Sequence, residues 1–394
     1  MLTYEQALDT LLAAAQPAAH TEILDTLQAL GRVLAAPQFS TINVPPADNS
    51  AMDGYALRSS DLPAQLLPIS QRVPAGSAPT ALQLGTAARI FTGAPIPAGA
   101  DAVVMQEKCL AEGEAVRIEQ APKPGENIRR AGEDIAIGAE VLPAGTRLGP
   151  AHLGLLASIG VAQVEVFARL RVAVFFTGDE LVMPGAPLGP GQIYNSNRYV
   201  LHGLLGALGC VITDLGIIPD NLAATRAALR QAAEGHDLVL TCGGVSVGEE
   251  DHIKAAVQAE GALETWKIAI KPGKPFAFGR VGATPFIGLP GNPVSSFATF
   301  QMLAQPYLRK RQGLHEVLPK AIRMRADFSW SKAPPVREFL RVQRNAAGGL
   351  DLFPKQGSGV LSSCAWADGF VSNPPGQLIQ PGDLVDYIPF GDAL

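Results

Sequence analysis

LVLTCGGVSVGEED, residues 238–251, is the stretch from which the fold of this chain is best predicted. It begins with the apolar run 238–240, which is typical of a buried parallel strand. Gly243 and Gly244 then end the strand and allow the backbone to approach a ligand closely or to adopt a positive φ. Small, hydroxyl and acidic residues follow, namely Ser246, Gly248, Glu249, Glu250 and Asp251.

This loop lies where an open α/β sheet binds its ligands, beyond the carboxyl end of a strand. The sequence therefore predicts a binding site here. The alternative interpretation is an ordinary strand-to-helix turn, in which the acidic residues cap a helix that starts at His252.

Composition narrows the class of protein. The chain has 394 residues, 47% of them hydrophobic and 17% charged, with a formal net charge of -5. At roughly 150 residues per domain, this length suggests two to three domains. The net negative charge and the lack of a run of Lys and Arg residues disfavour a nucleic-acid partner. The absence of a signal-like start and of an apolar run of about 18 residues predicts a cytoplasmic protein without a membrane span. The four scattered cysteines fit no zinc spacing and indicate reduced thiols.

The sequence predicts helices in the N-terminal region. Thr3 and Gln6 form a capping box ahead of an apolar face, and a second helix-like pattern runs over residues 24–34. Short apolar runs separated by Gly and Pro turns then predict a small β-rich unit over residues 42–136. Three polar clusters of this unit, at 48–54, 92–93 and 129–134, are ordinary loops when each is considered alone.

Strand and helix patterns alternate from residue 169 onward. This order predicts an α/β unit with a central, doubly wound, mostly parallel sheet and right-handed crossovers. The expected strands are 172–176, 211–215, 238–240 and 286–289, and the expected helices are 197–208, 222–233, 252–258 and 294–303.

Two further segments of the α/β unit suggest anion binding. Residues 266–271 have a period of two, which places Lys267 and Lys271 on one face of a strand, and Lys274 follows in a Gly/Pro turn. A solvated strand edge is the alternative. Asn292 and Pro293 suit the N-cap and first positions of a helix, whose free amides favour phosphate.

The chain after Pro319 reads as a C-terminal β domain with a hydroxyl-rich loop near residues 356–363. The fold class is therefore α/β plus β in several domains. The boundaries we predict are a discontinuous helical linking domain (1–41 with 137–168), the small β-rich domain (42–136), the α/β domain (169–318) and the C-terminal β domain (319–394).

Carboxylates, lysines and a helix start at neighbouring strand ends describe a site for a phosphate and a divalent metal. Hard oxygen ligands favour Mg²⁺, and the lack of His or Cys clusters argues against zinc.

The chain resembles the molybdopterin molybdenumtransferase family, the MoeA type related to the C-terminal domain of gephyrin, along nearly its whole length. The match is looser after Pro319. The motifs that carry the resemblance are DNSAMDGYA (48–56), FTGAPIPAGADAVV (91–104), AGEDI (131–135), TGDEL (177–181), CGGVSVGEED (242–251), IKPGKPFAFG (270–279) and LPGNPVS (289–295).

The resemblance implies a molybdopterin-binding type of α/β domain and the insertion of molybdate into adenylylated molybdopterin, with hydrolysis of the adenylate and release of AMP. It also implies Mg²⁺ and a homodimer whose site lies between the α/β domain of one chain and the small β domain of the other. The molybdopterin adenylyltransferase and cofactor-receiving enzymes are further expected partners.

Roles follow from motif position and residue chemistry. Glu180 and Asp251 would bind Mg²⁺ or orient the attacking water, while Lys267, Lys271 and Lys274 would hold molybdate and the pterin phosphate. Asp53, Thr92, Arg129 and Asp134 would close the site from the partner chain, and Asp220 would line the nucleotide side. The other expected substrate-binding residues are Thr177, Gly243, Gly244, Ser246, Gly248, Pro290, Asn292, Pro293, Arg341 and Ser358.

Three other functions fit the sequence less well. A molybdopterin adenylyltransferase resembles only the α/β unit and has no use for the other domains. An interaction scaffold gains nothing from clustered like charges. A dehydrogenase is disfavoured because the chain has no dinucleotide-binding glycine fingerprint.

Overall fold

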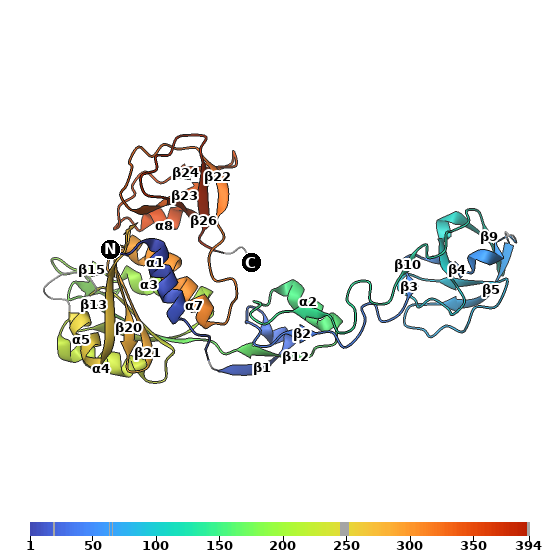
Figure 1. Ribbon diagram of the computed structural model, residues 1–394, viewed down its shortest axis with the longest axis horizontal. Coiled ribbons are helices and arrows are strands. Elements are labelled where there is room, and N and C mark those ends of the chain that lie inside the picture. Colours follow the sequence, from blue (N-terminus) through green and yellow to red (C-terminus); the bar gives the residue numbers. More distant parts are fainter. Residues whose placement is uncertain (19, 63, 65, 245–251, 392–394) are drawn as a thin grey trace.

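The computed structural model describes residues 1–18, 20–62, 64, 66–244 and 252–391. The molecule is elongated (Figure 1). The α/β unit and the C-terminal β unit lie together at one end, the small β unit lies at the other, and a narrow linking unit joins them.

The α/β unit is built on a six-stranded sheet in the order β16-β13-β17-β21-β20-β18. The first four strands are parallel to one another, and β20 pairs antiparallel with its two neighbours, β21 and β18. This confirms the predicted doubly wound, mostly parallel sheet. The strands are β13 (Arg171–Thr177), β16 (Val211–Ile218), β17 (Leu238–Cys242), β18 (Gly261–Lys267), β20 (Pro275–Val281) and β21 (Thr284–Leu289).

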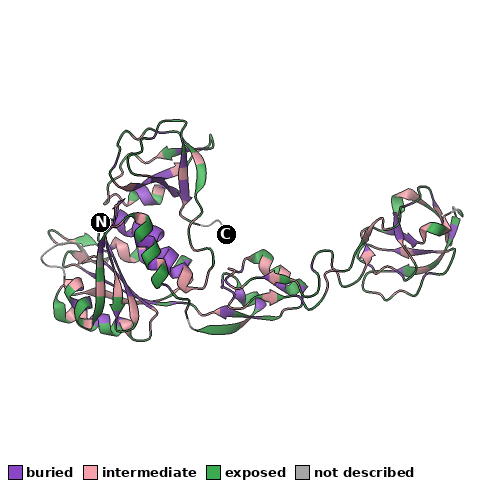
Figure 2. Ribbon diagram, viewed as in Figure 1, coloured by how far each residue is buried: buried purple, intermediate pink, exposed green. Residues whose placement is uncertain are grey.

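Helices cover both faces of this sheet. Alternate residues of β13 enter two different cores: Val172 and Val174 pack with α1, α3 and α6, whereas Ala173 and Phe175 pack with α4 and α5. Buried residues accordingly follow the strands (Figure 2). The helices are α1 (Tyr4–Ala14), α3 (Ser196–Ala207), α4 (Leu222–Ala233), α5 (His252–Glu260), α6 (Pro293–Thr299), the π-helical turn η4 (Phe300–Ala304) and α7 (Gln305–Arg311).

Helix α1 begins at the predicted capping box. The Thr3 amide donates to Gln6 Oε1 at 2.9 Å, and the Gln6 amide donates to Thr3 Oγ1 at 3.2 Å. Its buried residues Leu8 and Leu11 lie in the core of the α/β unit. The structure thus places α1 with the α/β unit, although the sequence groups it with the linking segment 137–168.

The period-two segment 266–271 is not one strand. Strand β18 ends at Lys267, and the short β19 (Ile270–Lys271) pairs instead with β23 of the C-terminal unit. An isolated bridge from Leu2 to Ile268 lies between them. The prediction of one continuous strand that carries both lysines is therefore wrong, because backbone pairing with two distant segments divides it.

The linking unit combines two separated pieces of the chain around a small core that includes Leu34, Leu142 and Leu156. The helix predicted over residues 24–34 is wrong, because the start of this segment pairs with β12 as an antiparallel strand. The apolar spacing misled because Leu27 is 89% exposed and does not mark a buried helix face. The elements are β1 (Thr21–Asp25), η1 (Thr26–Ala29), β2 (Gln38–Phe39), β11 (Glu140–Leu142), α2 (Pro150–Ser158) and β12 (Gln163–Phe167).

The small β unit holds a six-stranded sheet in the order β7-β4-β6-β5-β9-β8. The pair β5–β6 is parallel, and the other pairs are antiparallel. Its elements are β3 (Asn49–Ser50), β4 (Gly54–Leu57), η2 (Ser59–Asp61), β5 (Leu66–Val73), β6 (Ala87–Ile90), β7 (Ala102–Met105), η3 (Gln106–Lys108), β8 (Cys109–Glu112), β9 (Ala115–Ile118) and β10 (Ile128–Arg129).

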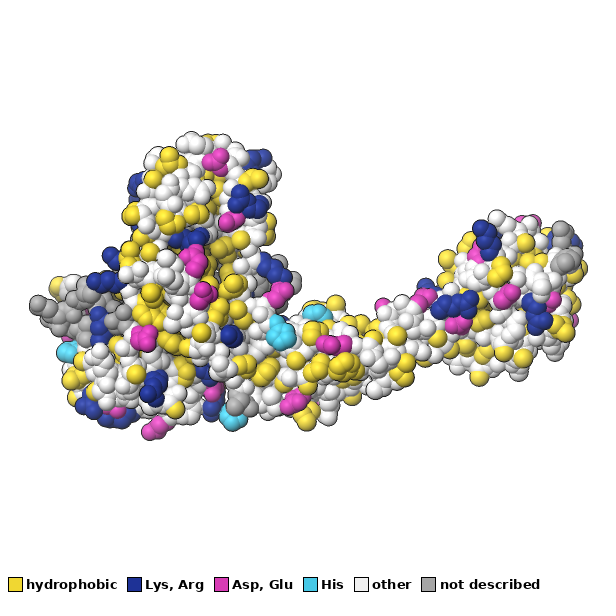
Figure 3. Space-filling model, in the orientation of Figure 1, with side chains coloured by type: hydrophobic (Ala, Val, Ile, Leu, Met, Phe, Trp, Pro, Cys, Tyr) yellow, Lys and Arg dark blue, Asp and Glu magenta, His cyan; other side chains and the backbone are white. Residues whose placement is uncertain are grey.

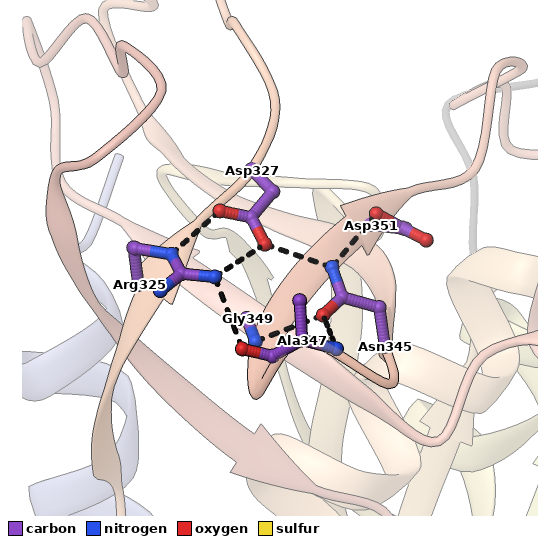
Figure 4. A network of polar contacts seen from close by, with 6 residues as sticks. All are labelled: Arg325, Asp327, Asn345, Ala347, Gly349 and Asp351. Atoms are coloured by element: carbon purple, nitrogen blue, oxygen red, sulfur yellow. Dashed lines mark hydrogen bonds and ion pairs between the residues drawn. The ribbon is translucent and has the colours of Figure 1, made fainter.

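The C-terminal unit is a closed barrel, because β23 pairs with both β24 and β25. Hydrogen bonds among Arg325, Asp327 and Asn345 connect the ends of the neighbouring strands β22 and β24 (Figure 4). The short helix α8 interrupts the predicted all-β pattern. The elements are β22 (Ile322–Ala326), β23 (Arg337–Arg344), β24 (Gly349–Leu352), α8 (Ser362–Trp366), β25 (Gly369–Asn373) and β26 (Leu384–Pro389).

Candidate functional site

A cavity of about 470 Å³ lies at the carboxyl ends of β13 and β17, beside the turn from β21 to α6. This is where a parallel sheet is expected to bind its ligands. The predicted site residues that line it are Thr177, Glu180, Asp220, Gly243, Gly244, Pro290, Asn292 and Pro293. Ser246, Gly248 and Asp251 lie outside the described residues, so their assignments stay predictions.

Two glycines shape the floor of the cavity. Gly243 and Gly244 have φ values of 97° and 65°, which residues with a side chain rarely adopt. The Gly243 amide donates to the Leu289 carbonyl at 3.0 Å, and a Cβ at Gly243 would lie 3.2 Å from the Thr177 carbonyl oxygen. Only glycine therefore lets the ends of the neighbouring strands converge this closely.

A buried thiol connects three walls of the cavity. Cys242 Sγ donates to the Pro290 carbonyl at 3.0 Å and lies 3.3 Å from Ser296 Oγ. Asn197 Nδ2 donates to Cys242 Sγ at 3.0 Å and to the Gly291 carbonyl at 2.7 Å. Burial raises the pKa of the Cys242 thiol to about 12. The thiol is therefore protonated at neutral pH and acts as a hydrogen-bonding connector, not as a nucleophile.

Sequence reasoning missed the residues Asn195, Ser196 and Asn197, which all line the cavity. Asn195 is 1% exposed and accepts from the Arg198 amide as the N-cap of α3. Buried Asn195 Nδ2 and Asn197 Oδ1 have no hydrogen-bond partner among the described residues. The sequence signal for these three residues is the run Asn-Ser-Asn at the start of a helix. Helix capping alone explains such a run, so it does not by itself indicate a binding site.

The described walls of the cavity are acidic. Glu180 and Asp220 line it, and no lysine or arginine does so within the described part of the chain. Glu180 follows β13 and precedes the small parallel pair β14 (Leu181–Val182) and β15 (Ile193–Tyr194), where its carbonyl accepts from the Ile193 amide at 2.8 Å. A polyanionic ligand would need additional positive charge here.

One of the backbone amides at the predicted helix start near Asn292 already has a hydrogen-bond acceptor within the protein. Pro293 is the first residue of α6, and the amide of Val294 donates to the Ser358 carbonyl at 3.0 Å. Ser358 thus reaches α6 from the C-terminal unit through its backbone. The amide of Val294 already has an acceptor within the protein, which weakens the expectation that this helix start binds phosphate.

The three predicted lysines do not line the described walls of the cavity. The side chains of Lys267, Lys271 and Lys274 are exposed, and Pro275, next to Lys274, is a lining residue. Lys271 Nζ lies 2.8 Å from Glu338 Oε1 of the C-terminal barrel.

Arg341 is buried inside the barrel at 1% exposure. Its guanidinium donates to Ser363 Oγ and to the carbonyls of Phe339 and Gly357. Burial lowers the pKa of Arg341 to about 10. The structure therefore shows this side chain holding the loop that carries Ser358, without access to a ligand in the cavity.

The remaining predicted residues lie in or beside the small β unit, at the other end of the molecule (Figure 1). Asp53 Oδ1 accepts from the Thr92 amide at 2.7 Å and from Thr92 Oγ1 at 2.8 Å. These hydrogen bonds, the amide first, hold the pKa of Asp53 below its usual value. Arg129 and Asp134 are exposed. Within one chain, these four residues are not brought to the cavity.

Charged side chains and candidate metal ligands are dispersed over the face shown and over the described residues. Lysine, arginine and acidic side chains are interspersed on the face shown in Figure 3. Among the residues that the structure describes, no group of three or more His, Cys, Asp or Glu is placed to hold a metal.

Family models match three parts of the chain. They are the MoeA N-terminal region (domain I and II) over residues 2–160, a probable molybdopterin binding domain over 173–310, and the MoeA C-terminal region (domain IV) over 323–390. A molybdopterin molybdenumtransferase of Haemophilus influenzae is 48% identical over 316 residues, 79% of this chain and 78% of that protein. This chain belongs to the MoeA family.

Other members agree over greater lengths. A molybdopterin molybdenumtransferase of Synechococcus elongatus is 34% identical over 396 residues, which cover 96% of each chain. A solved structure of a molybdopterin biosynthesis MoeA protein from Pyrococcus horikoshii has 32% identity and a TM-score of 0.81 over 100% of both chains. Membership of the MoeA family makes this chain an enzyme of molybdenum cofactor biosynthesis.

Proposed function

We propose that this MoeA-family chain inserts molybdate into adenylylated molybdopterin and releases AMP. The observation that carries the proposal is the preformed cavity at the strand ends, lined by Thr177, Glu180 and Asp220. Its size suits a cofactor-sized ligand. The family relatives named molybdopterin molybdenumtransferase support the choice of substrate.

Water attacks the phosphoanhydride, the bond between phosphorus and the bridging oxygen breaks, and AMP leaves. Glu180 is exposed at the cavity and is placed to accept a proton from water or to hold a cation. Asp251 is its predicted partner, outside the described residues. Lys267, Lys271 and Lys274 supply positive charge beside the cavity for molybdate and the pterin phosphate.

Mg²⁺ fits this chemistry as a substrate-bridging ion. The described walls offer two carboxylates and no cation, and Mg²⁺ usually binds through one or two carboxylates together with substrate phosphates. When bound, it would neutralise negative charge on the pyrophosphate. Glu180, with Asp251, would hold it.

We further propose a homodimer in which the partner chain brings Asp53, Thr92, Arg129 and Asp134 to this cavity. The separation of these residues from the cavity within one chain supports the proposal (Figure 1). Association with the molybdopterin adenylyltransferase and with cofactor-receiving enzymes stays a prediction, as does a cytoplasmic location. Within the described ranges, no helix is long and apolar enough to cross a bilayer.

The test is AMP release from adenylylated molybdopterin, measured with and without molybdate and Mg²⁺. We expect release that depends on molybdate, and a fall of about tenfold or more in kcat/KM for Glu180→Gln, equivalent to about 1.4 kcal/mol. Asp9→Asn, an exposed acid on α1, is the matched control and should match wild type. Consumption of ATP, or no AMP release under any condition, would refute the proposed reaction.

A further inference from the structure

A buried carboxylate of the C-terminal barrel contacts a lysine of the α/β unit. Glu338 is 2% exposed, and its Oε1 lies 2.8 Å from Lys271 Nζ. Its other oxygen, Oε2, accepts from Trp330 Nε1 at 2.6 Å. Both oxygens are therefore engaged by nitrogen donors, one from each of two structural units.

The backbone fixes the position of this pair. Strands β19 and β23 are parallel, and Lys271 and Glu338 are direct partners in their register. The Arg337 amide donates to the Ala269 carbonyl at 3.0 Å. The Arg337 side chain also reaches Ser372 of the barrel and Glu5 of α1. The contact between Lys271 and Glu338 is thus built into the attachment of the barrel to the α/β unit.

The two members of the pair differ in exposure. A carboxylate buried to this extent is costly unless it is paired and hydrogen-bonded. By contrast, the Lys271 side chain is 57% exposed. An ammonium has three donors, so one can bind Glu338 while the others stay available to a ligand. The arrangement restrains a flexible lysine and uses only one of its three donors.

We propose that Glu338, oriented by Trp330, is a positioning residue that holds Lys271 for anion binding beside the cavity. This inference rests on the proposed function, in which Lys271 contributes to binding of molybdate and the pterin phosphate. It gives the C-terminal barrel a role in the reaction: one of its buried acids sets the position of a cation that belongs to the α/β unit.

A second carboxylate of the barrel provides the matched control. Asp327 also accepts from a cation and from a nitrogen side chain, Arg325 and Asn345 (Figure 4). Both of these partners belong to the barrel. Asp327→Asn therefore removes the same kind of charge without affecting a lysine of the α/β unit.

The experiment is a double-mutant cycle on molybdate-dependent AMP release. Glu338→Gln keeps the side-chain size but removes the charge and replaces one acceptor oxygen with a donor. We expect it to lower kcat/KM about tenfold in the wild-type background and less than about twofold in a Lys271→Ala background. Trp330→Phe, which keeps the charge pair, should lower kcat/KM about threefold. Asp327→Asn should match wild type.

Equal effects of Glu338→Gln in both backgrounds, or no effect in the wild-type background, would overturn the proposal. A readout that is independent of the reaction separates this failure from failure of the proposed function. In an amine-labelling experiment on the folded protein, Lys271 should react faster in Glu338→Gln than in wild type, while Lys267 reacts equally in both. Unchanged labelling of Lys271 would also overturn the proposal, whether or not AMP is released.

Discussion

The two regions that carry predicted site residues are built differently. At the α/β end, Thr177, Gly243 and Pro290 form the walls of a preformed cavity whose polar groups are tied together from within. At the other end, Asp53 is exposed, and its carboxylate is already held by Thr92. The first region can enclose a ligand, whereas the second presents a carboxylate that is held in place at its surface. In the proposed function, the second region completes a site formed elsewhere.

The largest expected effect comes from a substitution that disturbs the small β unit alone. A Cβ at Gly54 would lie 1.9 Å from the Val104 carbonyl oxygen of the paired strand β7. We expect Gly54→Ala to destabilise this unit by about 3 kcal/mol and to leave the α/β unit protected. Hydrogen exchange, followed separately over residues 42–136 and 169–318, measures both.

The control for this prediction is Gly76→Ala in the same unit. Unlike Gly54, Gly76 has a positive φ, of 78°, and nothing lies within 4 Å of its added Cβ. Gly76→Ala should therefore destabilise the small β unit by only about 1 kcal/mol. Equal loss of protection in the two regions after Gly54→Ala would contradict the view that they are separate units.

A smaller effect should come from the thiol that connects the cavity walls. Cys242→Val removes the donor to the Pro290 carbonyl and the acceptor for Asn197. It should destabilise the α/β unit by about 2 kcal/mol, because buried polar groups lose their partners. Cys242→Ser keeps a donor and an acceptor and should cost less. Denaturant unfolding of both variants compares them, and a valine variant as stable as the serine variant would show that the contacts contribute nothing.

Most of the cavity could be predicted from the sequence, because its residues follow apolar strands directly. Thr177, Gly243 and Pro290 each stand at the end of such a run, and parallel strand ends share one edge of a sheet. The sequence does not identify Asn197 and Cys242 as cavity residues, because local patterns already explain both. An asparagine at a helix start is expected to cap the helix, and a cysteine in an apolar strand is expected to lie in the core.

Long-range pairing accounts for the other errors. Nothing local to Lys271 indicates that its partner lies 67 residues further along, in another unit. The same is true of residues 24–34, where pairing with β12 decides the structure against the apolar spacing. Arg341 shows the converse case: it is predicted to bind substrate because it falls near a family position, whereas its buried guanidinium donates to the Gly357 carbonyl.

The central claim is that the cavity of one chain is completed by the small β unit of another. The most direct measurement mixes an Asp53→Ala chain with a Glu180→Ala chain after each alone has been shown to be inactive. Random exchange makes about half of the dimers mixed, each with one intact site, so about a quarter of wild-type AMP release should return. No recovery, despite mixed dimers confirmed by mass spectrometry, would contradict the shared site.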